Sequence, residues 1–96
     1  MKYHIPDRVL SEIRFFAEKN GVESVVLFGS RAKGTNTERS DIDIVVYGGD
    51  FDAFYWDIHE GVNSLLSFDI INGAEDISEG LEKEIERDGV VIYEKA

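Results

Sequence analysis

The 96-residue sequence contains no cysteine, a single proline and no apolar run long enough to cross a membrane. The absence of cysteine excludes a disulfide framework, a thiolate zinc site and thiol catalysis. The first residues, Met1 to Pro6, lack the apolar core of a secretory signal peptide, and no segment approaches the roughly 18 apolar residues of a membrane span. We therefore expect a cytoplasmic protein, and the length is that of one domain.

Basic residues are also scarce, because ten lysines and arginines stand against twenty aspartates and glutamates, for a formal net charge of −10. A chain with this charge is repelled by nucleic-acid phosphates, so we expect no direct binding to nucleic acid. Any polyanionic ligand must be held locally, by a few cations, backbone amides or metal ions. Arg31, Lys33 and Arg39 cluster within nine positions and indicate where such a ligand would bind.

Hydrophobic periodicity predicts helices and strands that alternate along most of the chain. Helices are expected from Pro6 to Asn20, from an Asp50 N-cap to Leu65, and from Ile77 to Arg87. Strands are expected over 24–28, 41–47, 67–71 and 90–93, and residues 29–40 are expected to form a loop with a helical turn after Ser30. This order predicts one α/β (α+β) domain with helices packed on a sheet, and leaves open whether the strands pair in parallel or in a mixed pattern.

Three aspartates lie where aspartate is unusual, in or beside segments made of strand-forming apolar residues. Asp41 and Asp43 are two positions apart, so both carboxylates lie on one face of their strand, and Asp69 lies opposite its apolar neighbours in the next strand. If the two strands are adjacent, the three carboxylates can converge. Like charges this close are costly unless a cation lies between them. We therefore favour a magnesium site over the alternative in which Asp41 caps the preceding turn and Asp43 or Asp69 faces water on an open sheet.

The segment Gly29–Gly34 comes directly after a predicted buried strand. A glycine and a serine at a strand-to-helix turn can present free backbone N–H groups to a phosphate. The segment is not a Walker A loop, because Thr35 and Asn36 stand where lysine and serine or threonine are required, and it lacks the dinucleotide-binding glycine pattern. A Gly-Ser turn alone is a weak signal, and this one gains weight because the Asp41-Ile42-Asp43 strand comes soon after it.

The combination of Gly29-Ser30, Asp41-Ile42-Asp43 and Asp69 resembles the nucleotidyltransferase superfamily with a DNA-polymerase-β-like fold. More narrowly, Gly29–Gly34 followed by Ser40–Ile44 resembles the minimal nucleotidyltransferase (MNT) proteins, single-domain chains of about this length. The resemblance covers residues 1–96 as one minimal nucleotidyltransferase domain. It implies a mixed sheet of about four strands with helices packed on it.

The resemblance also implies a Mg²⁺-dependent transfer of a nucleoside monophosphate, with ATP as substrate and two metal ions. Asp41 and Asp43 would bridge the two Mg²⁺ ions, and Asp69 would bind the catalytic metal and help to deprotonate the acceptor hydroxyl. Gly29 and Ser30 would hold the β- and γ-phosphates. Arg31, which comes immediately after Ser30, is the first candidate among the basic residues for a phosphate contact.

Similarity to MNT proteins further implies an antitoxin of a toxin–antitoxin pair, which transfers AMP from ATP to a tyrosine of a HEPN-domain toxin encoded nearby. Two other functions stay open. The same fold could bind a toxin without catalysis, or it could modify a small molecule such as an antibiotic. Strong acidity suits docking against a basic, RNA-binding partner.

Other side chains are assigned to packing or to solvent. Phe51, Phe54 and Tyr55 lie on the apolar stripe of the middle helix and are predicted to be core, whereas Trp56 lies off the centre of that stripe and is a candidate interface anchor. The charged run from Glu79 to Asp88 is predicted to be a solvated helix face.

Overall fold

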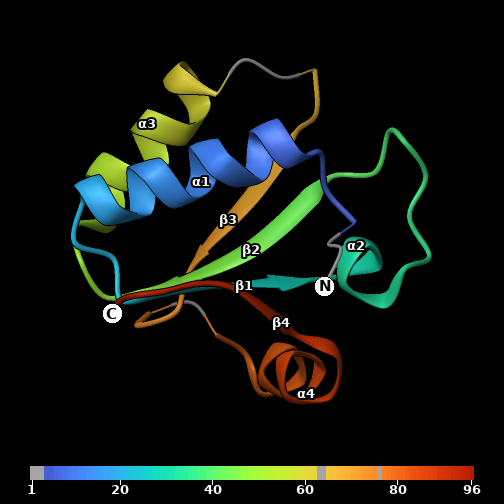
Figure 1. Ribbon diagram of the computed structural model, residues 1–96. Helices are drawn as coiled ribbons and strands as arrows, with labels where there is room; N and C mark the ends of the chain where they lie inside the picture. The colour runs from blue at the N-terminus through green and yellow to red at the C-terminus, as the bar shows by residue number, and fades with distance from the viewer. Residues whose placement is uncertain (1–3, 63–64, 76) are drawn as a thin grey trace.

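The chain forms a β-sheet with helices on both faces, as seen in a computed structural model that describes residues 4–62, 65–75 and 77–96 (Figure 1). The elements, in chain order, are α1 (Asp7–Lys19), β1 (Ser24–Phe28), α2 (Ser30–Lys33), β2 (Ile42–Tyr47), α3 (Phe51–Gly61), β3 (Phe68–Asn72), α4 (Glu79–Asp88) and β4 (Val90–Glu94). The predicted order of helices and strands is confirmed, and most boundaries differ by one or two residues, the usual fraying of element ends.

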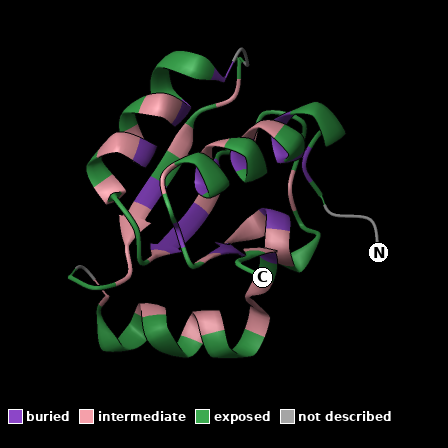
Figure 2. Ribbon diagram, turned by 60° about the vertical axis from the view of Figure 1, so that its left-hand side comes forward, coloured by how far each residue is buried: buried purple, intermediate pink, exposed green. Residues whose placement is uncertain are grey.

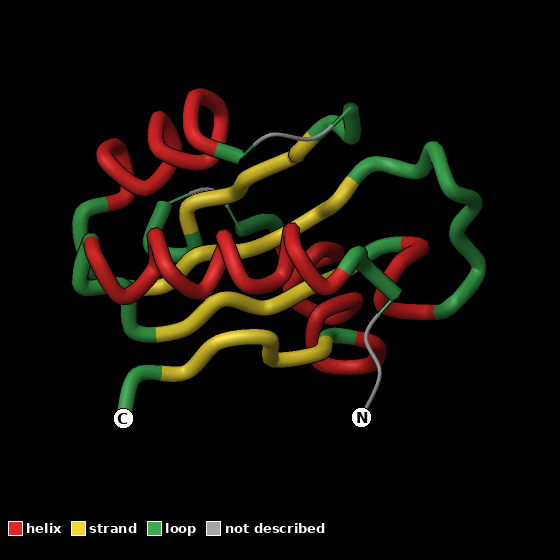
Figure 3. The backbone as a smooth tube through the Cα atoms, turned by 45° about the horizontal axis from the view of Figure 1, so that its top comes forward, coloured by secondary structure: helices red, strands yellow, loops and turns green. Residues whose placement is uncertain are grey.

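The sheet is mixed, with the strand order β3-β2-β1-β4 in the described residues (Figure 3). Strand β1 pairs antiparallel with both β2 and β4, whereas β2 and β3 are parallel. Parallel neighbours need a crossover connection, which α3 supplies between β2 and β3. This arrangement places the end of β1 and the starts of β2 and β3 at the same end of the sheet, beside α2 and the long loop that precedes β2.

The apolar core lies between the sheet and the helices α1 and α3. Its buried side chains come from α1, α3 and alternate positions of the strands: Val9, Leu10, Ile13, Ala17, Val25, Leu27, Ile42, Ile44, Val46, Phe54, Ile58, Ile70 and Ile92. The period of two along β2 therefore places Ile42, Ile44 and Val46 on the core face, as predicted. Phe54 is fully buried, while Trp56 on the same helix is 59% exposed.

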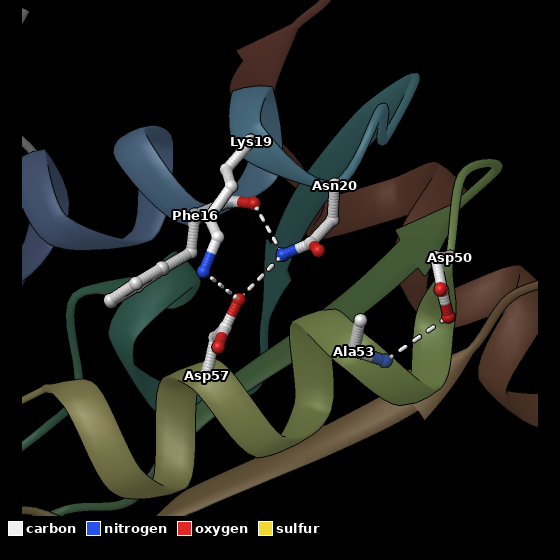
Figure 4. Close-up of polar contacts among 6 residues, drawn as sticks. All are labelled: Phe16, Lys19, Asn20, Asp50, Ala53 and Asp57. Atoms are coloured by element: carbon white, nitrogen blue, oxygen red, sulfur yellow. Dashed lines mark hydrogen bonds and ion pairs between the residues drawn. The ribbon is translucent and has the colours of Figure 1, made fainter.

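Polar contacts fix the end of α1 against α3 (Figure 4). The side-chain amide of Asn20, at the C-terminus of α1, donates to Asp57 Oδ2 at 2.9 Å, and Lys19 Nζ lies 3.3 Å from the same oxygen. Asp50 caps α3 as predicted, because its carboxylate accepts the N–H of Ala53 at 3.1 Å. These contacts set how the two helices lie on the sheet.

The prediction that α3 extends to Leu65 is wrong. The helix ends at Gly61, and Val62 already has an extended backbone with φ −85° and ψ 113°. A Cβ at Gly61 would lie 2.6 Å from Cζ of Phe16, so the ring of Phe16 packs directly on the α3 backbone there, and glycine is a poor helix former. Leu65 lies outside the helix and is fully exposed, and the intervening residues 63–64 lie outside the described residues.

None of the helices in the described part of the chain is both long enough and apolar enough to span a bilayer.

Candidate functional site

The sheet face opposite α1 and α3 is covered by α4 (Figure 2). Val26 and Val45 are paired across β1 and β2 and are buried on this face, and Val26 lies beside the C-terminal end of α4 at Gly89. Phe28 is paired with Asp43 in the same way, so the Asp43 side chain lies on the α4 face. Every residue of α4 is described, and none is buried, so this helix covers the face only loosely.

Asp43 and Asp69 are directly paired in the register of β2 and β3. Paired residues of neighbouring strands point to the same face, so both carboxylates lie on the α4 side of the sheet. Asp41 is exposed and precedes β2, which begins at Ile42, whose N–H donates to the Ser67 carbonyl at 2.9 Å. Convergence of the three carboxylates requires β2 and β3 to be adjacent, and they are. The three aspartates therefore lie at one end of one sheet.

The carboxyl of Asp43 lies in a strongly negative environment. The pKa of this carboxyl is raised from the ordinary 3.8 to about 6, and burial is the largest cause. The negative charges of Asp69, Asp41 and Glu84 contribute to this rise in pKa, in that order, and the guanidinium of Arg31 opposes it. A carboxyl under this much negative potential is a natural place for a cation.

Gly29 makes room for Asp43. It comes directly after β1 with φ +72° and ψ −157°, a backbone conformation that essentially only glycine adopts. A Cβ at this position would overlap the carboxylate of Asp43. The glycine therefore allows the turn after β1 and the carboxylate of β2 to approach each other.

The helical turn predicted after Ser30 is the one-turn helix α2, which begins at Ser30 itself. Ser30 is its first residue, half-buried, and the Gly29 carbonyl accepts the N–H groups of Ala32 and Lys33, both at 3.1 Å. Gly34 ends the helix in the left-handed conformation, with φ 79°. The Gly29-Ser30 turn thus lies at the sheet end that carries the aspartates.

The basic residues of this region are placed differently from one another. Lys33 and Arg39 are exposed, whereas Arg31 is 4% exposed. The guanidinium of Arg31 donates to backbone carbonyls of the surrounding loop. A contact between Arg31 and a phosphate stays a prediction, and these hydrogen bonds do not favour it.

The carboxylates at this end of the sheet are suitable donors for a metal ion. Carboxylate oxygens are the ligands that Mg²⁺ prefers, and the repulsion at Asp43 is what a bound cation would relieve. The side chains do not form a closed set of ligands: within the described residues, no three His, Asp or Glu groups lie close enough together to hold a metal ion. The residues fit the ion chemically, and binding would require their side chains to turn toward one point.

One acidic residue near Asp43 is not among the site residues predicted from the sequence. Glu84 lies on the inner side of α4, in a half-buried stripe with Leu81, Ile85 and Asp88, and its charge acts on Asp43. The charged run Glu79–Asp88 is predicted from the sequence to be a solvated face, and an exposed Glu79–Lys83 ion pair is present there at 3.6 Å. The i, i+3, i+4, i+7 spacing of the inner stripe could have indicated that Glu84 faces the sheet.

Comparison with protein families identifies the fold. The family described as "Polymerase beta, Nucleotidyltransferase" matches residues 12–96. The chain belongs to this family. It is a nucleotidyltransferase-family domain with the mixed-sheet fold that the motif combination implied. A search of the curated proteins found no match.

Solved structures share the nucleotidyltransferase fold. A toxin–antitoxin crystal structure with AMP-PNP has a TM-score of 0.70 and 23% identity, over 90% of this chain and 73% of the other. A mutant of the toxin–antitoxin MntA-HpeT has a TM-score of 0.69 and 21% identity, over the same shares of the two chains. A putative nucleotidyltransferase from Sulfolobus solfataricus has a TM-score of 0.51 and 20% identity, over 92% of this chain and 82% of that one.

Proposed function

We propose that this chain is a Mg²⁺-dependent nucleotidyltransferase that moves a nucleoside monophosphate, AMP from ATP, onto a hydroxyl of a partner protein. The observation that carries the proposal is the pairing of Asp43 with Asp69 beside Asp41, at the sheet end that also carries the Gly29-Ser30 turn. This arrangement occurs in a chain of the nucleotidyltransferase family.

The proposed roles rest on these positions. Asp41, Asp43 and Asp69 would hold two Mg²⁺ ions, and the backbone N–H groups of the Gly29-Ser30 turn, with the Ser30 hydroxyl, would hold the β- and γ-phosphates. Bound Mg²⁺ would supply positive charge at the α-phosphate and the leaving pyrophosphate. Asp69 would take the proton of the acceptor hydroxyl. The acceptor oxygen then bonds to the α-phosphorus as the bond to pyrophosphate breaks.

We propose a toxin as the partner, and specifically a HEPN-domain toxin in a hetero-oligomer. Support comes from the solved structures of the same fold, which include toxin–antitoxin structures, one of them with AMP-PNP. The MntA-HpeT mutant carries glutamate in place of two aspartates that lie two positions apart, the spacing of Asp41 and Asp43 here. The net charge of −10 suits a basic partner.

The test is to co-express the chain with the protein encoded beside it, add Mg²⁺ and ATP, and measure intact masses. The Asp41→Asn/Asp43→Asn variant removes the proposed metal ligands with little change in size. Asp52→Asn is the matched control, because Asp52 is an exposed carboxylate in the first turn of α3, away from the cluster.

The proposal expects whole AMP units on the partner with the wild type and with Asp52→Asn, and none with the double variant. Equal transfer by the double variant would overturn the site. Tight co-purification without any added mass, with every nucleotide tried, would instead favour a toxin-binding module that neutralises by contact.

A further inference from the structure

Arg31 is the one charged side chain that is buried among the described residues, with 4% of its surface exposed. Burying a guanidinium is unfavourable unless its N–H groups find acceptors. Among the ion pairs of the described residues, none includes Arg31. The acceptors of its N–H groups must therefore be uncharged.

The guanidinium donates to four backbone carbonyls. Nε donates to Ser40 at 3.0 Å, and one terminal nitrogen donates to Thr37 at 3.3 Å and to Glu38 at 3.2 Å. The other terminal nitrogen donates to His4 at 2.7 Å, just before α1. The planar fork of arginine, with five N–H groups in fixed directions, suits several carbonyls at once in a way that an ammonium does not.

These bonds join the two halves of the functional motif. Arg31 comes immediately after the Gly29-Ser30 turn, and Ser40 directly precedes Asp41. The loop between α2 and β2 extends beyond the end of the sheet (Figure 3). Its own bonds are local, between residues at most three positions apart: Thr37 N–H donates to Ser40 Oγ at 2.9 Å, Ser40 N–H donates to the Thr37 carbonyl at 3.2 Å, and Arg39 N–H donates to Thr37 Oγ1 at 3.3 Å. The side chain of Arg31 therefore ties this loop to α2.

We propose that Arg31 is a positioning residue that holds the loop of residues 34–40 and, through the Ser40 carbonyl, fixes Asp41 for cation binding. The proposal rests on the proposed function for the role of Asp41. It assigns to Arg31 a contact with the loop in place of the phosphate contact that its position in the sequence suggests.

The experiment compares Arg31→Lys with Arg31→Gln in the full chain. Lysine keeps the positive charge and loses the fork, whereas glutamine loses both. Arg14→Lys is the matched control, because Arg14 Nε also donates to a distant backbone carbonyl, that of Ile92 at 2.8 Å. The measurements are amide hydrogen exchange of residues 35–41 and of β1, and Mn²⁺ affinity without nucleotide, all well below the unfolding temperature.

We expect both Arg31 variants to exchange residues 35–41 roughly tenfold faster, as the loss of hydrogen bonds from a charged donor implies, with β1 unchanged. We also expect both to bind Mn²⁺ several-fold more weakly, and Arg14→Lys to change neither property. A purely electrostatic role predicts the opposite for Arg31→Gln, because removing a nearby cation strengthens the attraction of Mn²⁺ to the carboxylates.

Arg31→Lys with wild-type loop protection and Mn²⁺ affinity would overturn the proposal. If both variants fail to fold, Ser40→Ala tests the same loop with Arg31 intact. Removing the Thr37–Ser40 side-chain bond should then change both measurements in the same direction by a smaller factor, and no change would count against the proposal. A wild-type chain that binds no Mn²⁺ would contradict the proposed function, and the exchange of residues 35–41 alone would then decide the role of Arg31.

Discussion

The two faces of the sheet differ in how tightly they are packed and in the charge that they carry. The face under α1 and α3 is closed by fully buried side chains such as Ile13, Ile44 and Phe54. The face under α4 carries Asp43 and Asp69 at one end, and α4 itself contributes half-buried residues and no buried ones (Figure 2). The first face is apolar throughout, whereas the second combines buried residues such as Val26 and Val45 with like charges at one end.

The two faces contribute to the free energy of folding with opposite sign. Burial of apolar surface between sheet and helices is the dominant favourable term in folding. Carboxylates crowded at the α4 face oppose folding, as the raised pKa of Asp43 shows. Departures from local rules of this kind are expected at functional sites. Substitutions on the two faces should therefore have unequal and even opposite effects.

The largest effect is expected on the core face. Phe54→Ala should lower the free energy of unfolding by about 3–5 kcal/mol, because it removes a fully buried ring and leaves a cavity. Trp56→Ala is the matched control on the same helix, since Trp56 is 59% exposed and its loss should cost about 0.5 kcal/mol or less. Urea denaturation of both variants measures the contrast, and equal losses would show that the core is placed wrongly.

Gly29→Ala tests the close approach between the turn after β1 and the α4 face. We expect a loss of about 1–3 kcal/mol, from the positive φ and from the overlap with Asp43. Gly21→Ala is the control, because Gly21 also has a positive φ, of +68°, but a Cβ there meets nothing within 4 Å. The excess loss at Gly29 over Gly21, measured by thermal unfolding, reports the crowding at Asp43 together with the glycine-specific backbone conformation at Gly29, with ψ −157°.

Asp43→Asn should stabilise the metal-free protein at neutral pH. The pKa of Asp43 rises from 3.8 to about 6 on folding, so wild-type stability is lost as the pH rises through about 6. The asparagine variant avoids that loss, and because solvent screens a half-exposed group, we expect a gain on the order of 1 kcal/mol at about pH 7. The gain should shrink as the pH falls toward the ordinary pKa of an aspartate and vanish below it, where the wild-type carboxyl is protonated in both states.

Unfolding curves across this pH range, with and without Mg²⁺, measure the effect. Mg²⁺ should stabilise the wild type and leave Asp43→Asn unchanged, because the ion binds the folded carboxylates. Asp52→Asn serves again as the control for loss of one negative charge. A variant less stable than the wild type at neutral pH would mean that Asp43 is held by favourable contacts rather than strained by its neighbours.

The smallest effect is expected from the inner stripe of α4. Ile85→Ala should cost about 1 kcal/mol or less, below the range for a buried isoleucine, because Ile85 is only half-buried. Glu86→Ala, at an exposed position of the same helix, should change stability by about half of that or less. A loss at Ile85 comparable with that at Phe54 would remove the distinction between the two faces.

Much of the fold was predictable because local signals decided it. The alternation of Ile42, Asp43 and Ile44 assigned side chains to the two faces of β2, and Asp50 marked the start of α3. The end of α3 was not predictable in this way. Leu65 continues the apolar stripe in the sequence, but Gly61 packs against Phe16 of α1, a contact between elements far apart in the chain.

Spacing and side-chain type along the chain establish the order of the elements, the faces of the strands and the motif residues that indicate a nucleotidyltransferase. Folding in three dimensions decided that β2 and β3 are parallel neighbours with Asp43 beside Asp69, and that α4 turns Glu84 toward them. It also decided that Arg31 is buried among backbone carbonyls. The direction of a long side chain depends on the acceptors that folding brings within its reach, and sequence position does not contain that information.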